Sequence, residues 1–189
     1  MDFYGFYTGK IFDAYKYLGA HTEKQGVTFR TFAPSASRIT LIGEFNEWQE
    51  WDMNKVSDGN FWECYVPQAK AGQMYKYRIY DRSGNVVDHC DPYGFGMELR
   101  PNSASIIRDM NKYKFKDSQW MQNRSDCRKK PLNIYEIHFG SFRKPSDKAD
   151  DWYNYEEMID ILIPYLTKNG YNYLEIMPLA NNHFLLDNG

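Results

Sequence analysis

Apolar and polar residues alternate along much of the first half of the chain, with the period of two that indicates β-strands. Residues 27–34 show the alternation first, and Pro34 ends that run. The pattern recurs at residues 38–42, 61–66 and 74–80, and a short apolar run follows at residues 86–87. Turn-forming residues at 57–60 and 81–85 separate the later runs. Short alternating strands divided by turns predict an all-β sandwich, and a region of about 80 to 90 residues fits an immunoglobulin-like fold.

The first residues show a different period. Residues 10–18 carry four apolar side chains at the spacing i, i+3, i+4, i+7, beginning with Ile11. Gly19 follows, and glycine is common directly after the end of a helix. We therefore expect an N-terminal segment, residues 1–18, that contains one short amphipathic helix.

The last third of the chain combines both periods. Two mostly apolar runs flank a helical pattern, and the three segments lie at residues 134–139, 155–169 and 172–177. Strand, helix and strand in this order predict a βαβ unit with parallel pairing and a right-handed crossover. The chain ends soon afterwards, at Gly189, so we expect an α/β domain of which only the opening is present. Uncovered strands and an apolar helix face predict aggregation or the need for a partner.

The predicted helix has clear boundary signals. Asn154 is a plausible N-cap, and Gly170 follows the last periodic residue. Pro164 lies inside the pattern and is expected to kink the helix or to remove one hydrogen bond. The expected apolar face consists of Tyr155, Met158, Ile159, Leu162, Ile163 and Leu166.

Composition and charge exclude several classes of protein. The formal net charge of −2 does not favour binding to nucleic acid or to a membrane surface, and no apolar run approaches membrane-spanning length. The N-terminus lacks the features of a signal peptide. Cys64, Cys90 and Cys127 are odd in number and scattered, so neither a disulfide framework nor a zinc site is expected. We expect a cytoplasmic protein without a cofactor.

Aromatic residues make up 17% of the chain, an unusually high share. Aromatic side chains favour strands and fill the cores of sandwiches, which explains most of them. Exposed rings are also the surfaces on which sugars stack.

Residues 91–109 are rich in Pro, Gly, Asn and Ser and are expected to be loop-like. Residues 111–130 are polar and basic, which predicts a solvated connector. The expected domains are therefore residues 19–110, a linker at 111–131, and the incomplete α/β part at 132–189.

Four stretches resemble one enzyme family. They are LGAH leading into FAPSASRITLIGEFNEW (18–48), DPYGFGMELRPNSAS (91–105), NIYEIHFGSF (133–142) and ILIPYLTKNGYNYLEIMPL (161–179). Together they resemble the amino-terminal part of the glycogen (1,4-alpha-glucan) branching enzymes of the alpha-amylase superfamily. The resemblance implies a glycogen-binding-type module followed by the first strand, helix and second strand of a (β/α)8 TIM barrel. It also accounts for Pro164, which the family tolerates at that position.

The resemblance implies a retaining transglycosylation. An α-1,4-glucan segment forms a glycosyl-enzyme, and a glucan 6-hydroxyl then takes the segment to form an α-1,6 branch. The catalytic carboxylates of the family belong to later barrel strands, and a barrel needs roughly 250 residues. They are expected beyond Gly189, so no catalytic residue is assigned within this chain and the chain alone is predicted to be inactive.

The family resemblance also implies a sugar site. Trp48, after the GEFNEW turn, and Lys76, in a later strand, match its stacking and hydrogen-bonding residues. A second platform tryptophan is missing from residues 83–87, and Trp48 could instead be a packing residue between the module and the barrel. α-Glucan or glycogen is the expected partner, and the remainder of the barrel is expected in the full-length protein.

Other candidate residues have simpler explanations. Glu136 and His138 lie two apart on one predicted strand, and structural hydrogen bonding is the favoured role for both. Glu44 and Glu47 flank a turn, where solvation explains them. The four histidines show no metal-ligand spacing.

Residues 179–186 depart from the pattern that the branching-enzyme family shows after the second barrel strand.

Two alternative functions remain open. One is a non-catalytic glycogen-binding or scaffolding protein, in which the β-domain is the working part. The other is a related debranching or trehalose-releasing hydrolase, which shares the module and the start of the barrel. The segment at residues 91–105 argues against the hydrolase.

Overall fold

The computed structural model describes residues 1–99, 101–124, 130–145 and 152–177. The expectations for Cys127 and for the segment after Met177 lie outside these residues. The chain forms two compact units, Met1–Lys114 and Phe115–Gly189. Each unit is considered by itself.

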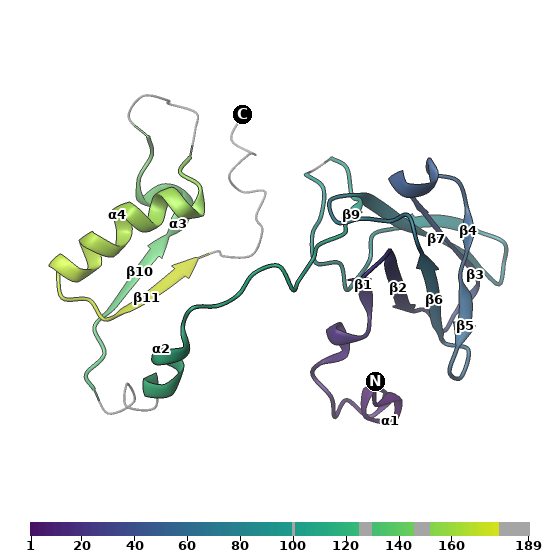
Figure 1. The fold of residues 1–189 in the computed structure, drawn as a ribbon, viewed down its shortest axis with the longest axis horizontal. Helices are drawn as coiled ribbons and strands as arrows, with labels where there is room; N and C mark the ends of the chain where they lie inside the picture. The colour runs from purple at the N-terminus through teal and green to yellow at the C-terminus, as the bar shows by residue number, and fades with distance from the viewer. Residues whose placement is uncertain (100, 125–129, 146–151, 178–189) are drawn as a thin grey trace. The chain divides into compact units, whose positions relative to one another are not determined.

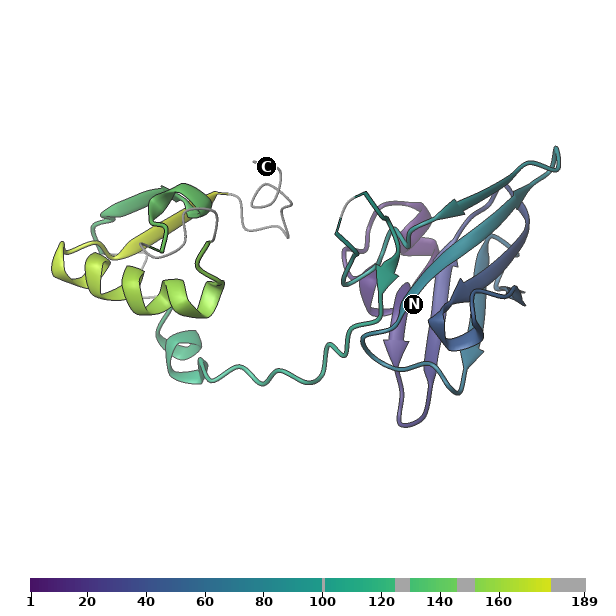
Figure 2. The same ribbon diagram turned by 90° about the horizontal axis from the view of Figure 1, so that it is seen from above.

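The first unit contains two antiparallel sheets (Figures 1 and 2). Its strands are β1 (Gly19–Thr22), β2 (Val27–Phe32), β3 (Ala36–Gly43), β4 (Trp51–Asp52), β5 (Asn54–Val56), β6 (Phe61–Val66), β7 (Met74–Asp81), β8 (Val86–His89) and β9 (Ser105–Ile106). One sheet has the order β1-β2-β6-β5, and the other has the order β4-β3-β7-β8 with β9 also paired to β7. The predicted all-β unit is confirmed.

The core lies between the two sheets. Alternate residues of both sheets, with side chains from the loops between them, form one buried apolar cluster. Phe29 of β2 and Tyr75 of β7 meet across it, with their ring centroids 4.9 Å apart and the ring planes at 68°. Such edge-to-face pairs add to the stabilisation that burial of the rings already provides. The alternation in the sequence therefore reflects two sheets that each bury one face.

The predicted helix at residues 10–18 is wrong. The helix lies earlier, at α1 (Phe3–Tyr7), where the side chain of Asp2 caps it by accepting a hydrogen bond of 2.9 Å from the Gly5 amide. Only a single 3-10 turn, η1 (Ala14–Lys16), forms inside the predicted segment. The apolar spacing was misleading because those side chains do not share one packed face. Gly19 begins β1 with a φ of 102° instead of ending a helix.

The second unit contains the predicted strand-helix-strand order. β10 (Ile134–His138) pairs in parallel with β11 (Tyr173–Met177). α4 (Tyr155–Lys168) connects them, and α3 (Phe139–Phe142) follows β10 directly. A further short helix, α2 (Ser118–Asn123), lies inside the segment that was expected to be a solvated connector, and its residues are exposed.

α4 begins as the sequence predicts. Asn154 and Glu157 form a reciprocal capping box, with hydrogen bonds of 2.9 and 2.8 Å. Pro164 is accommodated within a helix that continues to Lys168. The predicted apolar face is too wide: Met158, Leu162 and Leu166 are buried, whereas Ile159 and Ile163 are 57% and 52% exposed. A two-stranded sheet is too narrow to cover the whole apolar surface of the helix.

Candidate functional site

The outer face of the β4-β3-β7-β8 sheet carries the residues that the sequence predicted for sugar binding. Tyr75 and Tyr77 of β7 point into the core, so Lys76 between them lies on the outer face. Ile42 of β3 is directly opposite Lys76 in the antiparallel register. The chain leaves β3 one residue later, at Gly43, and turns over this end of the sheet.

The loop after β3 is fastened to the sheet at its start. It opens with the 3-10 turn η2 (Glu44–Asn46). The Glu44 carboxylate accepts a hydrogen bond of 2.8 Å from the Met74 amide at the start of β7. The Phe45 side chain is buried, and its ring centroid lies 5.4 Å from that of Phe29. The first half of the loop is therefore attached to the core.

The second half of the loop contains two adjacent residues in the left-handed region. Glu47 has a φ of 55° and Trp48 a φ of 59°. For residues other than glycine this conformation costs about 1–2 kcal/mol each, so surrounding contacts must maintain it. The Trp48 amide donates a hydrogen bond of 2.8 Å to the Gly43 carbonyl. The Trp48 side chain remains 39% exposed.

The backbone geometry places Trp48 and Lys76 at the same end of one sheet. The Trp48 amide is hydrogen-bonded to the carbonyl of Gly43, and Gly43 pairs with Tyr75 across the two strands. The neighbouring residue pair of these strands is Ile42 and Lys76. A partly exposed indole and an ammonium group at one end of a sheet are groups that a sugar ring can use. The apolar C–H face of the sugar can stack on the indole, and its hydroxyls can accept from the ammonium.

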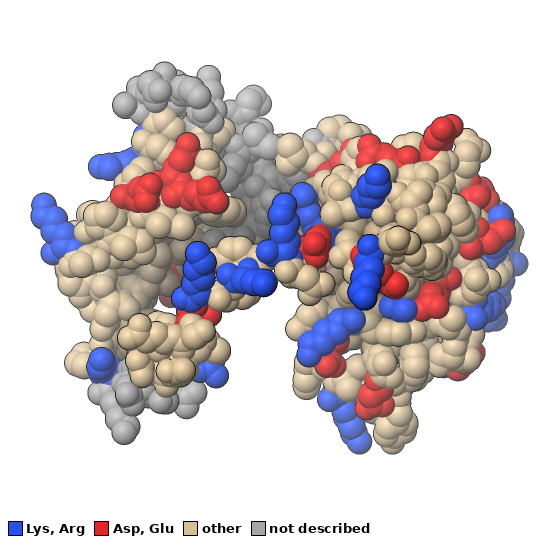
Figure 3. Space-filling model, viewed as in Figure 1, with Lys and Arg blue, Asp and Glu red and all other residues tan. Residues whose placement is uncertain are grey.

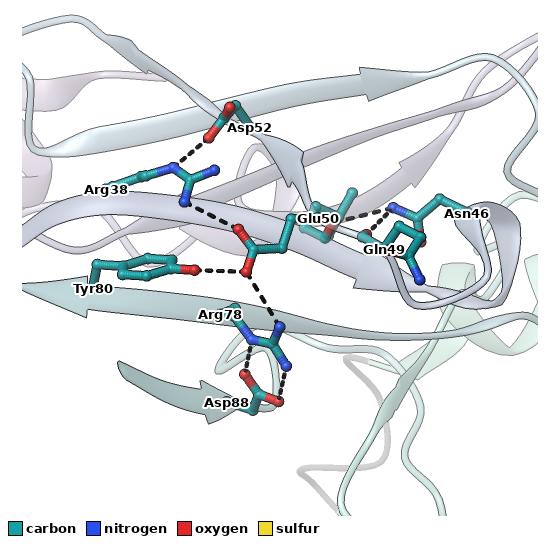
Figure 4. A network of polar contacts seen from close by, with 9 residues as sticks. Arg38, Asn46, Gln49, Glu50, Asp52, Arg78, Tyr80 and Asp88 are labelled. Carbon is teal, nitrogen blue, oxygen red and sulfur yellow. Dashed lines mark hydrogen bonds and ion pairs between the residues drawn. The ribbon is translucent and has the colours of Figure 1, made fainter. Parts of the chain in front are cut away.

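An ion-pair network centred on Glu50 lies beyond Trp48 on the outer face (Figure 4). The Glu50 carboxylate accepts hydrogen bonds from the hydroxyl of Tyr80 at 2.6 Å and from the guanidinium of Arg78 at 3.3 Å. It also lies 3.0 Å from the guanidinium of Arg38. The Tyr80 hydrogen bond, followed by the two arginines, holds the pKa of Glu50 below its usual value. Glu50 therefore ties the chain after Trp48 to both β3 and β7.

The same network also includes the carboxylates of Asp88 and Asp52. Arg78 makes two hydrogen bonds to the carboxylate of Asp88 on β8, at 2.8 and 3.0 Å, and these lower the pKa of Asp88. Arg38 also bonds Asp52 on β4 at 2.6 Å. Figure 3 shows blue and red side chains interspersed on the visible face of the β-sandwich. The charges of Arg38, Glu50, Arg78 and Asp88 are therefore paired with one another.

The remaining candidate residues take the positions of ordinary structural or surface groups. Glu44 is a structural acceptor, as described above, and Glu47 is an exposed loop residue. Glu136 and His138 are both exposed on β10, and His138 Nδ1 is 3.0 Å from the hydroxyl of Ser141. No group of three or more metal-ligating side chains is found among the described residues. In the described part of the chain, no helix combines the length and the apolar character needed to cross a membrane.

Sequence reasoning missed two residues of this site, Asn46 and Glu50. Asn46 belongs to the GEFNEW turn but was interpreted only as a turn residue. The contacts of Glu50 depend on Arg38, Arg78 and Tyr80, which are brought together by strand pairing. The sequence carries no local signal for such a network.

Comparisons with known proteins place the chain near carbohydrate-active enzymes. Residues 17–94 match the model of the family described as carbohydrate-binding module 48 (isoamylase N-terminal domain). The 1,4-alpha-glucan branching enzyme of Fusobacterium nucleatum is 37% identical over 187 residues, covering 97% of this chain and 30% of that protein. The enzyme of the same name from Geobacillus stearothermophilus is 38% identical over 192 residues, again with 97% and 30% covered. The chain thus spans about a third of the length of these relatives.

Solved structures share the fold at lower identity. A putative alpha amylase from Salmonella typhimurium is 22% identical, with a TM-score of 0.60 over 87% of this chain and 25% of that one. A Klebsiella pneumoniae pullulanase, in a structure with maltotriose, is 21% identical, with a TM-score of 0.63 over 88% of this chain and 20% of its own. Residues 17–94 are therefore similar to a carbohydrate-binding module, and nearly the whole chain is similar to part of the 1,4-alpha-glucan branching enzymes.

Proposed function

We propose that the β-sandwich binds α-glucan, with Trp48 as the stacking platform and Lys76 as the hydrogen-bond donor. The observation that carries this proposal is the partly exposed Trp48 ring, held on a fastened loop at the same end of the sheet as Lys76. A residue of the sandwich core would be buried, whereas Trp48 is 39% exposed. The alternative role, packing between the module and the barrel, is distinguished by the affinity test below. A surface with one ring predicts weak binding that becomes useful when many glucan chains are present.

We further propose that the full-length protein is a branching enzyme of glycogen synthesis and that it works in the cytoplasm. The transfer would move an α-1,4-glucan segment to a glucan 6-hydroxyl and form an α-1,6 branch, with catalytic carboxylates from outside this chain. Identities of 37% and 38% to branching enzymes over nearly the whole chain support this activity over a debranching hydrolase, since the pullulanase structure is only 21% identical.

We also propose that β10, α4 and β11 are the first βαβ unit of a (β/α)8 barrel. In-register parallel pairing of the two strands supports the proposal, as does the helix that packs against them. The small sheet also presents Ile134, Tyr173 and Met177, which are exposed. Apolar strand residues of this kind are suited to the interior of a barrel. In this account the module spans residues 19–110, the linker 111–131 and the barrel portion 132–189.

Replacing Trp48 by alanine is expected to weaken binding to glycogen at least about tenfold, because the stacking surface is lost and a tenfold change needs only about 1.4 kcal/mol. Retardation of the protein in native gels that contain glycogen measures this affinity. Trp120→Ala is the matched control, since Trp120 is 61% exposed and belongs to the second unit. A Trp48→Ala protein that is retarded as strongly as the parent would show that Trp48 is a packing residue.

A further inference from the structure

The loop that presents Trp48 depends on the side chain of Asn46. The amide oxygen of Asn46 accepts a hydrogen bond of 2.9 Å from the Gly43 amide. Its amide nitrogen donates to the carbonyl of Leu41 at 3.2 Å and to the carbonyl of Gln49 at 2.7 Å (Figure 4). Asn46 therefore joins the end of β3, before the turn, to the residue that directly follows Trp48.

These bonds span the strained part of the loop. Glu47 and Trp48, the two residues with positive φ, lie between Asn46 and Gln49. The Gln49 amide also donates to the Asn46 carbonyl at 3.0 Å, so the two residues are linked through both backbone and side chain. A closed link of this kind excludes the extended conformations that Glu47 and Trp48 would otherwise prefer.

The other fastenings of the loop act on different residues. Glu44 and Phe45 hold the loop before the strained pair, and Glu50 holds the chain after it. Within the described part of the chain, the side-chain hydrogen bonds of Asn46 are the ones that reach both sides of Trp48.

Asn46 is also fully engaged inside the loop. A side-chain amide has two hydrogens to donate, and the carbonyls of Leu41 and Gln49 take one each. No amide hydrogen of Asn46 is left for a sugar hydroxyl, and its amide oxygen already accepts from Gly43, so the printed contacts of this side chain all act within the loop.

The outer face of the sheet beside this loop is covered rather than open to solvent. Ile42 is only 3% exposed although it lies on the outer face and is not part of the core cluster between the sheets. The platform end of the sheet is therefore a packed surface, and the position of the loop on it is well defined.

We propose that Asn46 is the positioning residue of the glucan platform: its side-chain amide locks Glu47 and Trp48 in the left-handed conformation that presents the indole at the Lys76 end of the sheet. This inference rests on the proposed function, because it assumes that Trp48 is the platform. Asn46 contacts no sugar and supplies pre-organisation, which raises affinity by removing the cost of ordering the loop when a ligand binds.

The test uses the whole chain, with maltoheptaose as the ligand and with four variants: Asn46→Ala, Asn46→Asp, Trp48→Ala and Asn123→Ala. Asn46→Asp keeps the acceptor for Gly43 but loses both donors. Each Asn46 variant is expected to raise the dissociation constant at least about fivefold. Asn123→Ala is the matched control, since Asn123 is an exposed asparagine of the second unit, and it is expected to bind as the parent does.

A second readout reports on the ring itself. With 5-fluorotryptophan incorporated, the fluorine resonance missing from the Trp48→Ala protein is that of Trp48. In the parent this resonance is expected to be single and narrow, and in the Asn46 variants it is expected to shift or broaden as the ring loses its fixed position. A side chain that stabilised only the global fold would leave the resonance unchanged in variants that are still folded.

The outcomes separate the inference from the proposed function. If Trp48→Ala binds maltoheptaose as the parent does, the platform itself is refuted. If Trp48→Ala loses affinity while both Asn46 variants keep it, the platform stands and the positioning role of Asn46 is overturned. Should Asn46→Ala fail to fold, Asn46→Asp decides between these results, because it retains the size and one hydrogen bond of the native side chain.

Discussion

Replacing Asp91 by alanine is expected to lower the free energy of unfolding of the β-sandwich by about 3 kcal/mol, because it leaves buried hydrogen-bond donors without an acceptor. Asp91 is only 3% exposed. Its carboxylate accepts from the hydroxyls of Tyr75 and Tyr77, at 2.7 and 3.1 Å, and from the Tyr93 amide at 2.8 Å. Both of these tyrosine hydroxyls belong to side chains that are fully buried in the core.

Urea unfolding followed by tyrosine and tryptophan fluorescence measures this change. Asp13→Ala is the matched control, since the ion pair of Asp13 with Lys16 is exposed, with 55% and 65% of the two side chains accessible. Isolated surface ion pairs contribute little, so Asp13→Ala is expected to cost less than about 1 kcal/mol. Equal losses for the two variants would contradict the buried network.

The pH dependence of stability gives Asp91 a second signature. Burial raises the pKa of Asp91, and the hydrogen bonds from Tyr75, Tyr93 and Tyr77 only partly oppose this effect. The folded state therefore binds a proton more tightly than the unfolded state, and the stability due to Asp91 falls as the pH rises from the unfolded pKa of about 4 through the folded pKa. Asp91→Asn is expected to remove this fall. Parallel stability profiles above pH ~4 for the parent and the Asp91→Asn protein would contradict it.

The second large effect is expected in the second unit. Backbone amides of β10 and β11 are expected to exchange with deuterium at least about 100-fold faster than those of β3 and β7 in the same molecule. A pair of strands with one helix is marginal as an independent structure. Exposure of Ile159 and Ile163 on α4, and of Ile134 and Tyr173 on the strands, leaves this unit with much apolar surface in water.

Hydrogen exchange followed by mass spectrometry measures both units at once, so each chain serves as its own control. The expected result is early exchange in peptides from β10 and β11 and late exchange in peptides from β3 and β7. Similar protection in the two units, or sharp two-state unfolding that includes residues 132–177, would contradict the proposal that this unit needs further barrel strands.

Much of the fold could be predicted from the sequence because a strand that buries one face alternates apolar and polar residues. β2, β3, β6 and β7 each bury one face between two sheets, so Phe29, Leu41 and Tyr75 alternate with residues that point away from the core. Capping residues also leave a local record, and Asn154 marks the start of α4 for that reason.

The parts that could not be predicted depend on distant contacts or on very short segments. β4 and β5 have two and three residues, too few to display a period. The apolar spacing at residues 10–18 was interpreted as a helix, although Leu18 of that pattern is buried and Tyr15 is 50% exposed. These side chains share a spacing in the sequence but do not share a packed face.

The candidate site shows the same division. Trp48 and Lys76 could be named before the structure was known, because a family resemblance pointed to them. The hydrogen bonds that hold the loop could not be predicted, since Asn46 reaches Leu41 and Gln49 only after the chain has turned. Glu50 likewise meets both Arg38 and Arg78 only because β3 and β7 pair.

The most direct test of the account is to map maltoheptaose binding onto the chain by chemical-shift changes of its backbone amides. The account predicts that the largest changes cluster at residues 43–49 and around Lys76. A different surface lies at the turn between β1 and β2, where residues such as Lys24, Pro67 and Lys70 line a separate groove. Changes centred on that groove, or no changes at millimolar sugar, would contradict the proposal that Trp48 is the glucan platform.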